Sequence, residues 1–515
     1  MDEVLIALVV GLFKLVYWLL RGVFRVLRGI VRAIAAVLTG STSQRQEVVL
    51  SKMKRAAPAL PGKGAAKGVD PTPRVGKHLD ATRALRALCE AQRNTRRFAP
   101  TLDGIVERGE RLASQLRIDS RATPEQLGRL VRDESLRAIV GDLMDARRGT
   151  LAGLLDDTDA LANASYAPIV EYCKQRDIAL ASDRAATAID GDKLFFMSID
   201  DPSGLATIVL PSSFSTDIST WPAIAHEIAH DFFRSVDGLP RQLRAQLQLG
   251  TNVALLGPED GQVGVRVLVE HAVAAWMEEL FADSFGTMML GPAYVHTMMQ
   301  AFASPDEPTR ALEMLYQVDQ TKPVYEEHPP GHVRVVAGCR LLGRMGYGKE
   351  ADALEARWRK LHGEPTCVYS ALSDGRWVRV DEGIVLDRAA QVGTSLYMHG
   401  LDCLRGQPLR SVAGLDFGPR EHEQARRIGE RLASGRPVDV KDPRLLIAGA
   451  VIGTVAAPQQ AAFIYALARN AIEGVDAPAA ERALEGEVTG FEVGAEAARE
   501  AFLAGIILGP PLSRR

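Results

Sequence analysis

Two histidines and a glutamate lie within one five-residue stretch, His226-Glu227-Ile228-Ala229-His230. If this stretch is helical, the two imidazoles lie one turn apart on the same face, and Glu227 falls on the same side. Two such imidazoles can supply two of the four ligands of a tetrahedral zinc ion, and the adjacent carboxylate is placed to take a proton from water. The spacing therefore predicts half of a zinc site with a general base beside it.

A helix predicted over residues 222–236 positions this motif. Pro222 suits the first turn of a helix. Ile224, Ile228 and Phe232 form an apolar arc opposite the histidines, so we expect the motif to face a cleft and the back of the helix to face the core. The alternative is an ordinary amphipathic helix that carries two surface histidines.

A third ligand is expected from the downstream stretch WMEELFADSFGTMM, in which Glu279 and Asp283 lie four residues apart. On a helix, one of these carboxylates can bind zinc while the other orients a ligand histidine. Glu278 and Glu270 are rival ligands, but neither is followed by an acid four residues later. The alternative is a core helix with a solvated acidic edge. Small residues share the face of Glu279 and would allow close approach to the first helix: Ala275, Ala282 and Gly286.

The segment His328-Pro329-Pro330 predicts a stiff turn that leads into an apolar helix carrying Arg334. An imidazole held on a rigid turn can donate a hydrogen bond to an oxyanion that develops at a metal. Taken alone, a histidine before two prolines is more often part of a surface turn.

Together and in this order, the three segments resemble the gluzincin metallopeptidases, particularly the membrane-linked group that contains HtpX and the CAAX prenyl endopeptidases. The stretch FADSFGTMMLGP is also similar to the second zinc-binding helix of the ImmA/IrrE-type proteases, a neighbouring branch. The resemblance spans only residues 226–334. The chain lacks the several transmembrane segments of the first group, so prenylated or membrane-embedded substrates are not implied.

The resemblance implies a zincin-like catalytic core and hydrolysis of peptide bonds. Glu227 would act as the base, and His328 and Arg334 would lie near the substrate carbonyl. The zinc ligands that it implies are His226, His230 and Glu279.

The amino terminus differs in character from the rest of the chain. Residues 4–20 are apolar apart from Lys14, and the next four arginines fall on one helical face. Such a basic stripe on a long apolar helix is typical of an amphipathic helix at an anionic membrane, although the apolar run is just long enough to span one. We therefore expect residues 1–40 to associate with a membrane and the catalytic domain to lie on the cytoplasmic side. A helix buried within the protein is the alternative.

Three further segments follow. Residues 41–78, rich in Lys, Pro, Gly and Ala, predict a flexible linker. Residues 79–365 predict a helical region plus the metallopeptidase domain, whose core covers about residues 190–345, with helix breaks near Pro100 and Pro124. Residues 366–515 predict a mostly helical accessory domain with one short β-prone stretch.

The fold class expected is mainly α with a small β-sheet (α+β). Residues 193–200 and 205–211 predict two strands joined by a turn. Because zincin substrates commonly pair with an edge strand beside the active helix, residues 205–211 are the expected edge. A looser stretch then reaches about residue 264, and a long helical pattern continues to Leu290.

Composition narrows the function classes. The 515 residues carry a net charge of −3 without a concentrated basic face, which argues against a nucleic-acid partner. Five scattered cysteines form no CxxC pair. The expected partners are a peptide or protein substrate and a membrane, and the oligomeric state stays open. The leading hypothesis is a membrane-associated zinc metallopeptidase; the alternative is a catalytically inactive, zinc-stapled interaction or membrane scaffold protein.

Overall fold

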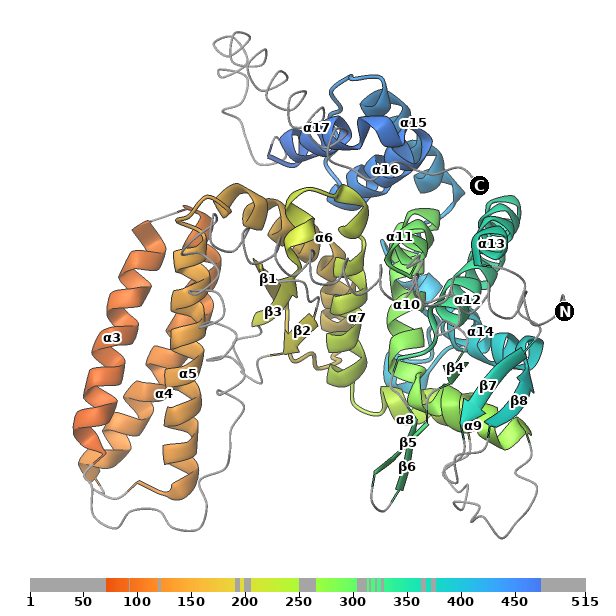
Figure 1. The fold of residues 1–515 in the computed structure, drawn as a ribbon. Helices are drawn as coiled ribbons and strands as arrows, with labels where there is room; N and C mark the ends of the chain where they lie inside the picture. Colours follow the sequence, from red (N-terminus) through yellow and green to blue (C-terminus); the bar gives the residue numbers. More distant parts are fainter. Residues whose placement is uncertain are drawn as a thin grey trace, which may run out of the picture. The chain divides into compact units, whose positions relative to one another are not determined.

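Helices make up most of the structure, and the strands form only small sheets, which confirms the predicted mainly α fold with a small β-sheet (Figure 1). The computed structural model describes residues 71–91, 93–118, 122–189, 195–198, 205–249, 265–302, 313–314, 316–319, 322–325, 328–362, 367–371 and 377–473.

The chain divides into two compact units. The first comprises residues 1–69 and 123–142, and its described part is most of helix α5 (Pro124–Ala146). The second comprises residues 70–122 and 143–515 and contains the other described elements. All the candidate site residues belong to the second unit.

The amino-terminal predictions are only partly open to comparison. The membrane helix predicted for residues 1–40 lies outside the described residues, and within those residues no helix is long and apolar enough to cross a bilayer. The linker predicted for residues 41–78 is wrong over its last residues, because helix α3 (Thr72–Ala91) begins there. Leu79 of this helix packs against Gly109 of α4 (Ala99–Ile118), and this burial stabilises the helix.

The predicted strand pair is confirmed. Strand β2 (Phe195–Ser198) pairs antiparallel with β3 (Leu205–Leu210). A strand that was not predicted, β1 (Arg184–Ile189), pairs parallel with β3, so the order in the sheet is β1-β3-β2. The expectation that residues 205–211 form an edge strand is therefore wrong, because β3 is central and has a neighbour on each side.

The outer edge of β1 is closed by side chains. Asn163 of helix α6 (Ala152–Gln175) accepts from the backbone N–H of Ala185 and donates to its carbonyl, at 3.1 and 2.9 Å. Asp159 accepts from the backbone N–H of Thr187, and Arg147 donates to the carbonyl of Thr187. Within this three-stranded sheet, and among its described residues, β2 is therefore the strand whose outer edge can still accept another strand.

The remaining helices differ from the predicted pattern in detail. The loose stretch before residue 264 contains α8 (Leu239–Gln246), and the long helix predicted to end at Leu290 breaks at Trp276 into two. The helices that follow α6 are α7 (Ala223–Ser235), α9 (Val265–Ala275), α10 (Met277–Leu290), α11 (Pro292–Phe302), α12 (Gly331–Arg344) and α13 (Gly348–His362). Later come α14 (Glu382–Met398), α15 (Pro419–Ala433), α16 (Pro443–Ala456) and α17 (Ala461–Glu473).

The other strands are short. The predicted β-prone stretch near residue 380 forms β8 (Trp377–Asp381), which is followed directly by α14. The helix begins there because Asp381 caps it by accepting from the backbone N–H of Ile384. Helix α14 packs on α10 and α12, so the packing is continuous across the predicted domain boundary at residue 365. The strands are β4 (Glu313–Met314), β5 (Tyr316–Asp319), β6 (Lys322–Tyr325), β7 (Cys367–Ala371) and β8 (Trp377–Asp381).

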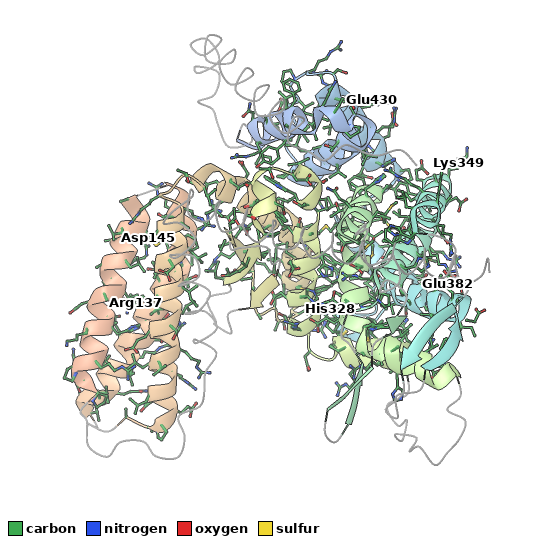
Figure 2. The ribbon with its side chains drawn as sticks, viewed as in Figure 1. Arg137, Asp145, His328, Lys349, Glu382 and Glu430 are labelled. Carbon is green, nitrogen blue, oxygen red and sulfur yellow. The ribbon has the colours of Figure 1, made fainter. Side chains whose placement is uncertain are left out.

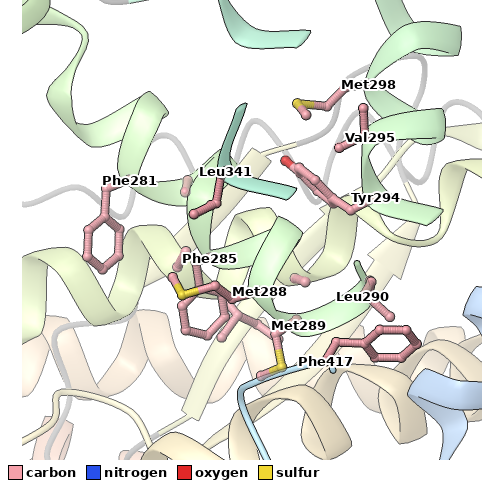
Figure 3. Packing of buried hydrophobic residues seen from close by; sticks show 14 of the residues in the cluster. Phe281, Phe285, Met288, Met289, Leu290, Tyr294, Val295, Met298, Leu341 and Phe417 are labelled. Atoms are coloured by element: carbon pink, nitrogen blue, oxygen red, sulfur yellow. The ribbon is translucent and has the colours of Figure 1, made fainter. Parts of the chain in front are cut away.

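Aromatic packing joins the two helices that carry the candidate site. Phe281 of α10 lies 5.9 and 5.0 Å, between ring centroids, from Phe232 and Phe233 of α7. Phe285 adds a contact to Phe232 at 6.1 Å. Such pairs each contribute on the order of 1 kcal/mol beyond the burial of their surface. Figure 3 shows Phe281 and Phe285 within the buried cluster of α10, α11 and their neighbours.

A second close contact brings α15 and α16 together at glycines. A Cβ at Gly429 would lie 2.6 Å from the carbonyl oxygen of Gly449 and 2.9 Å from the nitrogen of Gly453. We expect Gly429→Ala to destabilise the protein by about 1–3 kcal/mol, since these backbones must separate. The measurement is thermal or urea unfolding. Gly343→Ala is the matched control: no atom lies within 4 Å of its added Cβ, and an equal loss there would contradict the packing explanation.

Candidate metal centre

Helix α7 begins one residue after Pro222, as the sequence predicts, and lies against β2, β3 and α10. Ile224 and Ile228 are completely buried in the core. His226 and His230 lie on the side of the helix that meets α10. Their side chains keep only 9% of their exposure, so the motif is more enclosed than the expected cleft.

Three potential ligand atoms converge between α7 and α10. The two Nε2 atoms of His226 and His230 lie 3.1 Å apart. Glu279 of α10 places Oε2 3.4 Å from His226 Nε2 and Oε1 3.5 Å from His230 Nε2. Among the described residues, these three form the group of His, Cys, Asp or Glu side chains that could hold a metal ion.

The size of this triangle fits a tetrahedral ion. Zinc binds imidazole nitrogen and carboxylate oxygen at about 2.0–2.2 Å, so two ligand atoms of a regular tetrahedron lie about 3.3–3.6 Å apart. The two imidazole nitrogens lie 3.1 Å apart, and each lies 3.4 or 3.5 Å from the nearer oxygen of the Glu279 carboxylate, which is close to that range. The three side chains are therefore spaced closely enough to share one tetrahedral ion.

The distal nitrogens of the two histidines contact carboxylates. His226 Nδ1 lies 3.1 Å from Asp283 Oδ1, and His230 Nδ1 lies 2.9 Å from Glu278 Oε1. Because an ionised carboxylate can only accept, each Nδ1 carries a proton. When both rings are neutral, as metal ligands must be, their Nε2 lone pairs lie 3.1 Å apart. These two nitrogens are therefore the atoms that would bind a cation.

The surrounding charges favour a divalent cation. With all acids ionised and both histidines neutral, as metal ligands must be, the carboxylates outnumber the guanidinium groups by two, which a divalent ion would neutralise. The carboxylates are those of Glu227, Glu278, Glu279 and Asp283, and the guanidinium groups are those of Arg234 and Arg334.

The pKa shifts report the same negative field. Burial lowers the pKa of His226, but Asp283 and Glu279 outweigh it and raise that pKa to about 10. Burial raises the pKa of Glu279, but His226, Arg334 and His230 outweigh it and lower that pKa to about 2. The acids around the site therefore favour positive charge at the position that His226 and Glu279 share.

Glu227 differs from the other acids. It is buried, and burial raises the pKa of its carboxyl, against the opposing effect of His226 and His230. Among the described residues, Glu278, Glu279 and Asp283 are held by ion pairs, and Glu227 takes part in none of those pairs. A buried carboxyl with a raised pKa beside a candidate metal-binding group is suited to exchanging protons.

Arg334 and His328 both lie at the site, in different surroundings. Arg334 donates to both oxygens of Asp283, at 2.7 and 2.8 Å, and its third nitrogen lies 3.2 Å from Glu279 Oε2. His328, labelled in Figure 2, is 64% exposed, with Nε2 3.5 Å from Glu279 Oε1. The roles expected for them near a substrate carbonyl stay predictions. From its position, Arg334 is suited to hold the carboxylates of Asp283 and Glu279 in place.

A buried network fixes the helix that carries Arg334. His332 of α12 accepts at Nδ1 from the indole N–H of Trp358, so its Nε2 carries the proton and donates to Glu382 of α14 at 2.7 Å. Figure 2 labels Glu382. Three helices, α12, α13 and α14, are thereby joined at a residue only two positions before the arginine.

Two contributors were missed or misjudged from sequence. Glu278, considered only as a rival ligand, instead orients His230 and pairs with Arg234 at 2.7 Å. Tyr294 of α11 contacts His226 and was not singled out at all. The small residue Gly286 was a signal, but the close neighbour that it admits is the ring of Tyr294 rather than α7, which corrects that expectation.

We expect His230→Ala to lose the metal, because a three-donor site becomes a two-donor site. The measurement is the metal content of the purified protein, with one equivalent expected in the wild type. His399→Ala is the matched control, since His399 is exposed and outside the group. Metal retained at the wild-type level in His230→Ala would contradict the site.

The chain was compared with protein-family models, with curated proteins and with solved structures, and no match was found in any of the three.

Proposed function

We propose that this chain is a membrane-associated, zinc-dependent metallopeptidase that hydrolyses peptide bonds in a peptide or protein substrate, as an endopeptidase. One observation carries the proposal: a buried His-His-Glu group that could hold a metal ion has a further buried carboxyl, Glu227, adjacent to His226 in the chain. A metal site that only stabilises the fold does not require this additional acid, whereas hydrolysis requires a base.

The donor set favours zinc over other common ions. Catalytic zinc sites can use two imidazoles and one carboxylate as ligands and leave a further position for water. Magnesium and calcium prefer oxygen ligands instead. His226, His230 and Glu279 would hold the ion. When bound, zinc would act as a Lewis acid and lower the pKa of a water molecule at the site toward neutrality.

The residues of the chain would divide the remaining work. Glu227 would accept a proton from the attacking water and deliver it to the nitrogen of the leaving amine. Arg334 would keep Asp283 and Glu279 in place through its ion pairs. His328, exposed beside Glu279, would donate a hydrogen bond to the carbonyl oxygen of the substrate.

Glu227→Gln tests the general base. We expect the variant to keep its zinc and to lose hydrolysis by about 10²-fold or more, because an amide cannot accept the proton. The measurement is mapping of cleavage sites in a proteome-derived peptide library, together with metal content. Glu171→Gln, an exposed change on α6, is the matched control. Undiminished cleavage by Glu227→Gln would exclude this role.

The proposed membrane association is supported by the apolar run and the basic stripe of residues 1–40, and the catalytic domain would then lie on the cytoplasmic side. We expect these residues, fused to a fluorescent protein, to direct it to membranes. The control fusion replaces Arg21, Arg25, Arg28 and Arg32 by Gln and should bind anionic membranes less. A diffuse signal from the unaltered fusion would refute the anchor.

A further inference from the structure

Tyr294 is a buried tyrosine whose hydroxyl lies within the site. It lies 2.8 Å from Asp283 Oδ1 and 3.1 Å from His226 Nδ1. Because the carboxylate has no hydrogen to give, the tyrosine hydroxyl donates to Asp283. Its oxygen is then free to accept from the N–H of His226, which is shared between Tyr294 and Asp283.

The place for this ring is created by a glycine on the facing helix. A Cβ at Gly286 of α10 would lie 2.6 Å from Cζ and 2.7 Å from Cδ2 of Tyr294, which is closer than real Cβ contacts come. A side chain at position 286 would therefore push the ring, and its hydroxyl, away from His226. Figure 3 shows Tyr294 beside Val295 and Met298 of the same helix.

The two ligand histidines are held in unequal ways. The partners of His226 are Asp283 and Tyr294, which are both buried. The partner of His230 is Glu278, whose side chain is 29% exposed and is tied to Arg234, which is 57% exposed. Hydrogen bonds shielded from water are stronger and better defined in direction than exposed ones. His226 is thus the more firmly oriented ligand.

We propose that Tyr294 is a positioning residue that sets the metal affinity of the site by fixing the ring plane and tautomer of His226, with Gly286 as the position that seats it. The inference rests on the proposed function, because it concerns the same metal. The alternative role for Tyr294 is packing alone, which its ring would perform without its hydroxyl.

Tyr294→Phe separates the two roles, because it removes only the hydroxyl. We expect the zinc dissociation constant, measured by competition with a chelating dye, to rise about 10–100-fold. The visible absorption bands of the cobalt-substituted protein should also shift, since the geometry at His226 changes. The melting temperature of the metal-free protein should change little. Gly286→Ala should give the same loss of affinity by an independent route.

Two matched controls accompany these variants. Tyr465→Phe removes a hydroxyl that donates to the carbonyl of Phe214 at 3.2 Å and also contacts Arg469, and Tyr465 is not part of the candidate metal group. Gly343→Ala adds a Cβ where there is room. Both should bind zinc as the wild type does.

The outcomes are distinguishable. Unchanged zinc affinity and cobalt bands in Tyr294→Phe, with a wild type that binds zinc, would overturn this inference and leave the proposed function intact. A wild type that binds no zinc would overturn the proposed function itself. Unfolding of both Tyr294→Phe and Gly286→Ala without recovery on adding zinc would show a purely structural role and would also overturn the inference.

Discussion

The site depends on one contact, the face-to-face meeting of α7 and α10. The apolar side chains and the polar side chains of that contact depend on each other. The rings of Phe232 and Phe281 pack at one level and hold the helices at a fixed separation, so that His226 and Glu279 can meet at another. Without the aromatic packing, buried carboxylates and imidazoles would not stay out of water at such short distances, because burying polar groups is costly unless each finds a partner.

The partners come from progressively more distant parts of the chain. Helix α10 itself supplies the carboxylates behind the histidines, α11 supplies Tyr294, and α12 supplies Arg334. The arginine is held by a helix that His332 ties to α13 and α14. In the second unit, the side chains that contact the histidines are therefore held in turn by side chains of more distant helices. Such support keeps the geometry of a site to within fractions of an ångström.

Much of the site could be predicted from the sequence, because helical periodicity relates residues within one helix. It placed His226 beside His230 and identified Glu279 with Asp283 as the acid pair. It could not show which residues of different helices meet, so Tyr294 and the orienting role of Glu278 were not predicted. The fold class was predicted by composition, but β1, with its many alanines, lacks the usual strand pattern, and its absence from the prediction made β3 look like an edge.

The closed side of the small sheet has a consequence for self-association. Exposed strand edges are templates on which copies of a protein stack into cross-β aggregates. Because Asn163, Asp159 and Arg147 occupy the backbone groups of β1, another chain cannot extend the sheet from that side. In the described part of the chain this sheet can therefore be extended only past β2, the strand that packs against α7.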